Sequence, residues 1–239
     1  MTAESYLAES YLNAKNILVI APHPDDESLG CGGLIAKLAA MGRSFHTVFV
    51  TDGSASHLGS HKWSRQRIAA LREQEAGEAL SRLGIANQPR TFLRLHDAEM
   101  PSVSSADWHS ASGKVDEILG TFLPDLVLLP WRRDPHCDHR DSWRLVTDAI
   151  CKCAIRPRML EYTIWLEEYG APNDYPGADE TEPVDFDITA EIAIKRHAVE
   201  AHLSQTSDLI DDDPNAFRLS GATIDRLTGP LERYWRVIR

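Results

Sequence analysis

The sequence has few cysteines, no cluster of basic residues and no long apolar run. Four cysteines in 239 residues are too few for a disulfide-stabilised scaffold, and the spacing of Cys151 and Cys153 is not that of a zinc knuckle. The formal net charge is −11, because 36 acidic residues outnumber 25 lysines and arginines. An acidic chain of this kind lacks the positive surface that nucleic acids require, so we expect no nucleic-acid partner.

The apolar runs in the chain have the length of strands. The longest lie around residues 17–21 and 126–130, well short of the roughly 18 to 20 residues needed to cross a bilayer. Residues 1–15 have neither the basic start nor the apolar core of a signal peptide. We therefore expect no membrane span and a cytoplasmic protein with reduced thiols.

The composition is that of an ordinary globular protein, with 43% hydrophobic and 26% charged residues. The length is compatible with a single domain over residues 1–239. Apolar segments alternate with segments of helical period, which is typical of an α/β fold with a Rossmann-like, doubly wound and mainly parallel sheet. We predict strands at 16–22, 45–51, 90–95, 125–130 and 158–165, and helices at 106–122, 142–154 and 189–203. Two earlier helices have apolar stripes over residues 34–41 and 68–83 and end at Gly42 and Gly84.

The patterns say least about residues 167–239. Residues 167–185 contain three prolines and seven carboxylates, so we predict an exposed loop there, either a lid or a solvated connection. Residues 211–239 show a mixed pattern without a clear period. The predicted fold therefore rests on the first two thirds of the chain.

An unusual motif, Pro-His-Pro-Asp-Asp-Glu, follows the first predicted strand at residues 22–27. Carboxylates packed within a few ångströms raise one another's pKa and destabilise a fold unless a positive ion compensates them. The structural alternative is an acidic first helical turn, in which carboxylates complement the helix dipole. That alternative explains the three carboxylates but not His23 and Pro24.

A second motif, Asp-Pro-His-Cys-Asp-His, follows the fourth predicted strand at residues 134–139. Its two histidines, His136 and His139, are three positions apart and can face one centre, and neutral imidazole is a common zinc ligand. Alone, this spacing is equally compatible with two histidines in a surface loop.

The predicted topology brings the two motifs together. In a doubly wound sheet of strand order 3-2-1-4-5, the loops after strands one and four border the crevice where ligands bind. His23, Asp26 and His139 can then form a two-histidine, one-carboxylate site with a position open for water, as catalytic zinc requires. Asp25 is left beside that water as a general base.

These motifs resemble those of the PIG-L/LmbE family of zinc-dependent N-deacetylases, which remove acetyl groups from N-acetylglucosamine-type sugars. The resemblance implies an LmbE-like α/β fold and one Zn²⁺ per chain. It extends to the segments Thr51-Asp52-Gly53, Arg72-x-x-Glu75 with Ala79 and Leu83-Gly84, Asp97, Lys195-x-x-Ala198 and His202-x-Ser204-Gln205.

The resemblance also implies roles for individual residues. The zinc ligands would be His23, Asp26 and His139, and the general base would be Asp25. His136 would stabilise the oxyanion in its protonated form or act as an acid, oriented by Asp138.

Two further residues match positions that contact the sugar or its substituent in some relatives. These residues are Arg72 and Asp97, although Arg72 could instead pair with Glu75 on a helix surface. One departure is Asp134, which stands where some relatives have a tyrosine, so a tyrosine role in the oxyanion hole is not expected here.

The predicted reaction is hydrolysis of an acetamide on an amino sugar. Zinc would polarise the carbonyl and lower the pKa of bound water to about 7, and Asp25 would take the proton of that water. Either Asp25 or His136 would protonate the leaving amine. The predicted partner is a small amino-sugar substrate with an unspecified aglycone, and the oligomeric state stays open, with a homo-oligomer compatible.

Three alternatives stay open at this point. The same zinc site is compatible with hydrolysis of another acyl amide, such as an antibiotic or other small-molecule conjugate. The glycines of residues 30–33 and Asp52 favour a nucleotide-binding module, although their spacing is not Gly-x-Gly-x-x-Gly and carboxylates 25–27 would repel a pyrophosphate. A non-catalytic structural metal site would normally be closed by four protein ligands.

Overall fold

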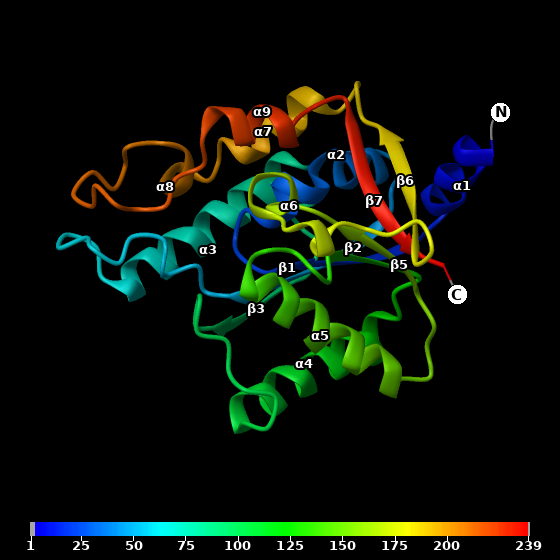
Figure 1. Cartoon of the computed structure of the whole chain (residues 1–239), viewed down its shortest axis with the longest axis horizontal. Helices are drawn as coiled ribbons and strands as arrows, with labels where there is room; N and C mark the ends of the chain where they lie inside the picture. Colours follow the sequence, from blue (N-terminus) through cyan, green and yellow to red (C-terminus); the bar gives the residue numbers. More distant parts are fainter. Residues whose placement is uncertain (1–2, 239) are drawn as a thin grey trace.

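The computed structural model describes residues 3–238, and the side chains of residues 7–238. Within this range the strands form one seven-stranded sheet of order β3-β2-β1-β4-β5-β7-β6 (Figure 1). Strands β1 to β5 are parallel, whereas β7 pairs antiparallel with both β5 and β6. The strand bounds are β1 Asn16–Ala21, β2 Ser44–Thr51, β3 Arg90–Leu95, β4 Leu126–Pro130, β5 Arg158–Tyr162, β6 Thr181–Asp187 and β7 Leu231–Val237.

Helices cover both faces of the sheet (Figure 1). One face carries α4 (Ala106–Phe122) and α5 (Cys137–Lys152). The other carries α2 (Asp26–Ala40), α3 (Arg65–Arg82), α7 (Ile192–Val199) and α9 (Gly221–Leu227). The shorter elements are α1 (Ala3–Leu12), which lies against β6, α6 (Leu166–Tyr169), η1 (Pro172–Asp174) and α8 (Leu203–Thr206).

Strand β1 shows how the sequence produces two cores. Its side chains alternate between the faces, with Ile17, Val19 and Ala21 in one apolar cluster and Leu18 and Ile20 in the other. Burial on both faces explains why this strand is a continuous apolar run, as parallel central strands are.

The predicted fold class is confirmed, and so is the strand order 3-2-1-4-5 within the larger sheet. Strand β3 and helix α4 have the predicted bounds. Gly42 and Gly84 follow α2 and α3 with φ angles of +71° and +86°, which is the left-handed conformation that glycine adopts without a steric penalty.

Several predicted elements were wrong in their extent. Helix α5 begins at Cys137 rather than at residue 142, so the second half of the second motif, residues 137–139, forms its first turn. Strand β5 ends at Tyr162 rather than at residue 165, and the predicted helix 189–203 is divided into α7 and α8.

The prediction of an exposed loop over residues 167–185 holds for most of residues 167–180, which are exposed or half-buried, but was wrong for the last five residues. Residues 181–185 belong to β6, in which Glu182 and Asp185 point outward while Val184 and Phe186 are buried. Pro183 fits because β6 is an edge strand of the sheet. Helix α1 had no counterpart among the predicted elements.

No helix among the described residues combines the length and the apolar character that a membrane span requires.

Candidate active site

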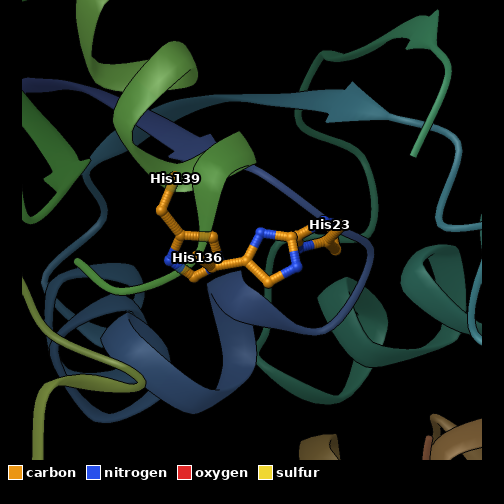
Figure 2. Close-up of side chains that lie close together, drawn as sticks. All are labelled: His23, His136 and His139. Carbon is orange, nitrogen blue, oxygen red and sulfur yellow. The ribbon is translucent and has the colours of Figure 1, made fainter. Parts of the chain in front are cut away.

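Both predicted motifs lie at the carboxyl ends of neighbouring parallel strands. His23 follows β1, and His136 and His139 follow β4, with His136 as the N-cap of α5. Figure 2 shows the three imidazoles converging, two from the start of α5 and one from the loop after β1. One nitrogen of each ring lies within 4.8 Å of a nitrogen of the others, a separation that a single metal ion can bridge.

Asp26 completes the predicted ligand set. Its Oδ2 lies 3.2 Å from His23 Nδ1 and 3.3 Å from His139 Nε2. Donor atoms bound tetrahedrally to zinc at about 2.0 to 2.1 Å are about 3.3 Å apart, so these separations suit one shared ion. Both ring nitrogens of His139 are buried and face carboxylates at 3.3 and 3.4 Å without hydrogen-bond geometry, which also fits a metal ligand.

Carboxylates stand behind both predicted histidine ligands. His23 Nε2 lies 3.1 Å from Asp138 Oδ2 and 3.2 Å from Asp97 Oδ1. His139 Nδ1 lies 3.4 Å from Asp134 Oδ1. Metal-binding histidines typically point their second ring nitrogen at a carboxylate, which fixes the tautomer and leaves the first nitrogen for the metal.

The electrostatic potential at the buried histidines and carboxylates of the site favours a positive ion. Burial alone would lower the pKa of His139, but Asp26 and Asp134 outweigh burial and raise that pKa to about 9. His23 behaves in the same way, because burial is outweighed by hydrogen bonds to Asp138 and Asp26 and its pKa rises well above the usual value. The buried carboxylates thus hold positive charge at this point, as protons or as a metal cation.

Asp25 has an unusual backbone conformation beside these ligands. Its φ of 149° is rare for a residue other than glycine, and such conformations persist where the surroundings hold them. The Asp25 N–H donates to Glu27 Oε2 at 3.0 Å, and its carboxylate accepts from Arg72 at 3.0 Å. Burial raises the pKa of Asp25 to about 6, against the opposing effect of Arg72.

Arg72 is an interior residue of the site and is only 3% exposed. Its guanidinium donates to Asp25 and to the carbonyl oxygens of Pro24 and Gly53, both at 2.8 Å. Gly53 has a φ of +64°, and a Cβ at this position would lie 2.7 Å from the guanidinium. The close approach therefore requires glycine.

The alternative pairing of Arg72 with Glu75 on a helix surface was wrong. Glu75 is buried and accepts hydrogen bonds from the backbone N–H and the hydroxyl of Ser204, at 2.7 and 2.6 Å. The predicted surface pair is thus two separate interior contacts.

His136 differs from the expectation in two ways. Burial and the neighbouring His23 and His139 lower its pKa to about 4, so the imidazole is neutral near pH 7 in the protein without an ion, not protonated as expected. Asp138 contacts it through a backbone N–H that donates to His136 Nδ1 at 3.2 Å, while the Asp138 carboxylate faces His23. The Nε2 atom of a neutral His136 then carries the proton.

A cavity of about 460 Å³ opens beside these residues. It is lined by the predicted residues His23, Asp25, Asp26, Arg72, Asp97 and His136. Asp97 thus lies where the sequence placed it, although its carboxylate also contacts His23 and accepts the Ala55 N–H at 2.8 Å. His139 is fully buried behind the cavity.

Two features of the site were not predicted from the sequence. Asp134, noted only as a departure from relatives, is fully buried behind His139 and accepts the His136 N–H at 3.0 Å. Trp165, at the end of a predicted strand, lines the cavity together with Tyr169 and Phe217, which come from the region with the weakest patterns. The sequence did contain a signal for Asp134, because this residue begins the second motif. It contained none for the three aromatic residues.

The glycines of residues 30–33 and His202 contribute to packing and do not line the cavity. The run lies inside α2, where a Cβ on Gly30 would be 2.3 Å from the Tyr162 ring, so these glycines permit close packing and do not form a phosphate-binding loop. His202 is buried and its Nε2 lies 3.1 Å from Glu27 Oε1, away from the cavity lining.

Comparison with known proteins gives several similarities. A deacetylase from Mycobacteroides abscessus, acting on 1D-myo-inositol 2-acetamido-2-deoxy-alpha-D-glucopyranoside, is 25% identical over 247 residues, which cover 87% of each chain. A 2'-N-acetylparomamine deacetylase from Streptomyces fradiae is 33% identical over 185 residues, covering 72% of this chain and 61% of the relative. The solved structure of GalB, a 4-carboxy-2-hydroxymuconate hydratase from Pseudomonas putida, has a TM-score of 0.70 at 17% identity and covers 94% and 96% of the two chains.

The hydratase shares the fold at low sequence identity, so the fold alone does not decide the reaction. The family match is more informative, because it covers the two motifs that converge in the site. Residues 18–150, more than half of the chain, match the PIG-L family, described as GlcNAc-PI de-N-acetylase. The chain belongs to the PIG-L family.

Proposed function

We propose that this protein is a zinc-dependent hydrolase that removes the acetyl group from the nitrogen of an N-acetylglucosamine-type sugar or conjugate. One Zn²⁺ per chain would be held by His23, Asp26 and His139. Family membership and the activities named for the relatives support the reaction, and the fit of the three donor groups supports the ion.

One observation carries the proposal. A buried carboxylate that is not part of the predicted ligand set, that of Asp25, lines the same cavity as His23 and Asp26. A structural metal site needs no such group, because it is closed by its ligands. A hydrolase needs a base beside an open position, and a pKa raised to about 6 keeps Asp25 ionised near pH 7 and close to the range useful for proton transfer.

The chain's own residues supply the remaining steps. When bound, the ion would polarise the acetamide carbonyl and acidify water. Asp25 accepts the water proton, and Arg72 holds the Asp25 carboxylate in place. His136, protonated on Nε2, donates a hydrogen bond to the oxygen that becomes negatively charged. The water oxygen bonds to the acetyl carbon, and Asp25 then returns its proton to the amide nitrogen as the C–N bond breaks, which gives acetate and the free amino sugar.

Metal analysis joined to an acetate-release assay tests this proposal. We expect about one zinc per chain in the purified protein, and zinc-dependent acetate release from N-acetylglucosamine glycosides. Bound zinc without release from any N-acetylated amino sugar would contradict the reaction, and a chain that binds no metal would contradict the site.

A matched pair of variants tests which residues are ligands. His136 is a member of the three-histidine cluster, so it competes with Asp26 for the third ligand position. We expect Asp26→Ala to lose bound zinc and His136→Ala to retain it while losing turnover. The reverse result would assign the metal to the three histidines.

The cytoplasmic location and a homo-oligomeric state stay predictions. Fractionation of cells and the solution mass of the purified chain would test them.

A further inference from the structure

Three aromatic side chains line the cavity that also contains the site residues. We call Trp165, Tyr169 and Phe217 the aromatic wall. The Trp165 and Phe217 rings meet edge to face with centroids 5.5 Å apart, and the Trp165 and Tyr169 centroids are 5.9 Å apart. Two segments distant in sequence therefore build one continuous aromatic surface.

The aromatic wall exposes more apolar surface than a core would. Tyr169 is 67% exposed and Phe217 is 41% exposed, whereas Trp165 beneath them is 9% exposed. Exposed aromatic surface at the edge of a cavity typically marks a place that a ligand covers. The chain thus has an apolar surface beside its candidate active site.

Backbone hydrogen bonds hold the aromatic wall in place. The Trp165 N–H donates to Asp134 Oδ2 at 3.2 Å, and the other oxygen of Asp134 faces His139. The Phe217 N–H donates to the Ser56 carbonyl at 2.9 Å, in the loop that also lines the cavity. Both attachments fix the wall relative to the site before any ligand binds, which lowers the entropic cost of binding.

The described lining of the cavity offers an anionic ligand no unpaired arginine or lysine side chain. Among the described residues that line it, Arg72 is the only arginine or lysine, and its guanidinium is already bonded to Asp25 and two carbonyls. Asp25, Asp26 and Asp97 add negative charge to the same lining.

The basic residues near the aromatic wall are also occupied. Arg226 pairs with Glu168, and Arg218 pairs with Asp208, at 2.8 and 2.7 Å. Beside the aromatic wall, a phosphate or carboxylate on the substrate would therefore meet only basic side chains that are already paired with carboxylates.

We propose that the aromatic wall binds the part of the substrate beyond the acetylated sugar, and that this part is an uncharged ring. This inference rests on the proposed function and names its substrate class. The C–H groups of a sugar or the edge of an aryl ring pack well on the negative faces of aromatic side chains. A cavity of about 460 Å³ holds a ligand of that size rather than a polymer.

Four substrates test this proposal with the zinc-loaded protein. They are the methyl glycoside, the phenyl glycoside and the 1-phosphate of N-acetylglucosamine, and a neutral disaccharide that carries the acetamide at its end. We expect kcat/KM for at least one ring-bearing substrate to exceed that for the methyl glycoside by about tenfold. We expect the 1-phosphate to be the poorest of the four.

Variants connect the preference to the aromatic wall. Tyr169→Ala and Phe217→Ala should bring the ratio of ring-bearing to methyl substrate close to one, mainly through KM, and Tyr169→Phe should restore it. The matched control is Tyr175→Ala, because Tyr175 is 44% exposed but does not line the cavity. An unchanged ratio in both alanine variants would overturn the proposal, as would a preference for the 1-phosphate.

Calorimetric binding of the same four compounds separates this inference from the proposed function. If no compound releases acetate, the deacetylase proposal fails, and tighter binding of the ring-bearing compounds would still support the aromatic wall. If acetate is released but the phenyl, disaccharide and methyl compounds bind equally, the wall proposal alone fails.

Discussion

Residues 18–150, the first part, and the remainder of the chain, the second part, contribute different kinds of side chain to the site. Residues 18–150 provide all the side chains that we propose for metal binding and proton transfer, and they come from the central parallel strands and their helices. The remainder provides the aromatic wall and the antiparallel strands β6 and β7. Reaction chemistry is thus placed by sheet topology, whereas the wall is placed by packing between distant segments.

The largest expected effect lies in the first part, at the adjacent residues Asp25 and Asp26. Asp25→Asn keeps the shape of the side chain but removes the base, so we expect kcat to fall about 10²- to 10⁴-fold with zinc content unchanged. Asp26→Ala should lower zinc content itself. Metal analysis and acetate release on the same samples check both results, and full activity of Asp25→Asn would contradict the assignment of the base.

A second, smaller effect is expected where the two parts meet, at Asp134. Its carboxylate faces His139 and also accepts the N–H groups of Ile164 and Trp165, both at 3.2 Å. Asp134→Asn should weaken zinc binding about 10- to 100-fold, as loss of a carboxylate behind a metal-binding histidine does. Competition with a chelator measures this, and Asp138→Asn is the comparison variant behind His23. Unchanged zinc affinity would show that the Asp134 carboxylate only fixes the backbone at Ile164 and Trp165, next to the aromatic wall.

The third prediction concerns a buried contact between the two parts, His202 with Glu27. Burial opposes protonation of His202, but Glu27 outweighs burial and raises its pKa, with Asp25 and Glu75 acting in the same direction. Because the folded pKa is above the ordinary value, the stabilisation is complete below pH 6.5 and decreases as the pH rises through the folded pKa.

His202→Asn tests this pH dependence. At pH 6 the variant should lose about 3 to 5 kcal/mol of unfolding free energy, as loss of one partner of a buried pair does. The difference from the wild type should shrink between pH 6.5 and pH 9 in urea denaturation at fixed zinc concentration. A difference that grows with pH would contradict the direction of the pKa shift.

The smallest effect is expected at the outer edge of the second part. Arg233 on β7 pairs with Asp185 on β6, and both side chains are substantially exposed. Arg233→Ala should cost about 0.2 to 1 kcal/mol, because solvent screens an exposed ion pair. Thermal unfolding measures it. A much larger loss would show that the edge strands contribute more to stability than their exposure suggests.

The sequence predicted the first part well because its signals are local. Uninterrupted apolar runs such as β1 identify strands buried on both faces, and the order of parallel strands then brings residues 23–26 and 136–139 together. Even there, the start of α5 was misplaced, because a polar first turn has no apolar stripe.

The second part was predicted poorly for a physical reason. The carboxylates and prolines of residues 167–185 are typical of loops, but β6 gains its structure by pairing with β7, some fifty residues later in the chain. The aromatic wall depends on the same kind of distant contact, since Phe217 and Trp165 meet only in the folded protein. Such contacts leave no period in the sequence.

The glycines of α2 bear on which substitutions this protein tolerates. A Cβ on Gly33 would lie 2.4 Å from Ile188, and a Cβ on Gly30 would lie 2.3 Å from Tyr162. The helix therefore packs too closely at these positions for an additional methyl group. The first turn of that helix carries Asp26. An alanine at Gly30 or Gly33 would lift the helix and displace Asp26 from His139 without altering any charged residue. We therefore expect that one added methyl group, about one or two helical turns from Asp26, can inactivate the protein without changing a reacting group.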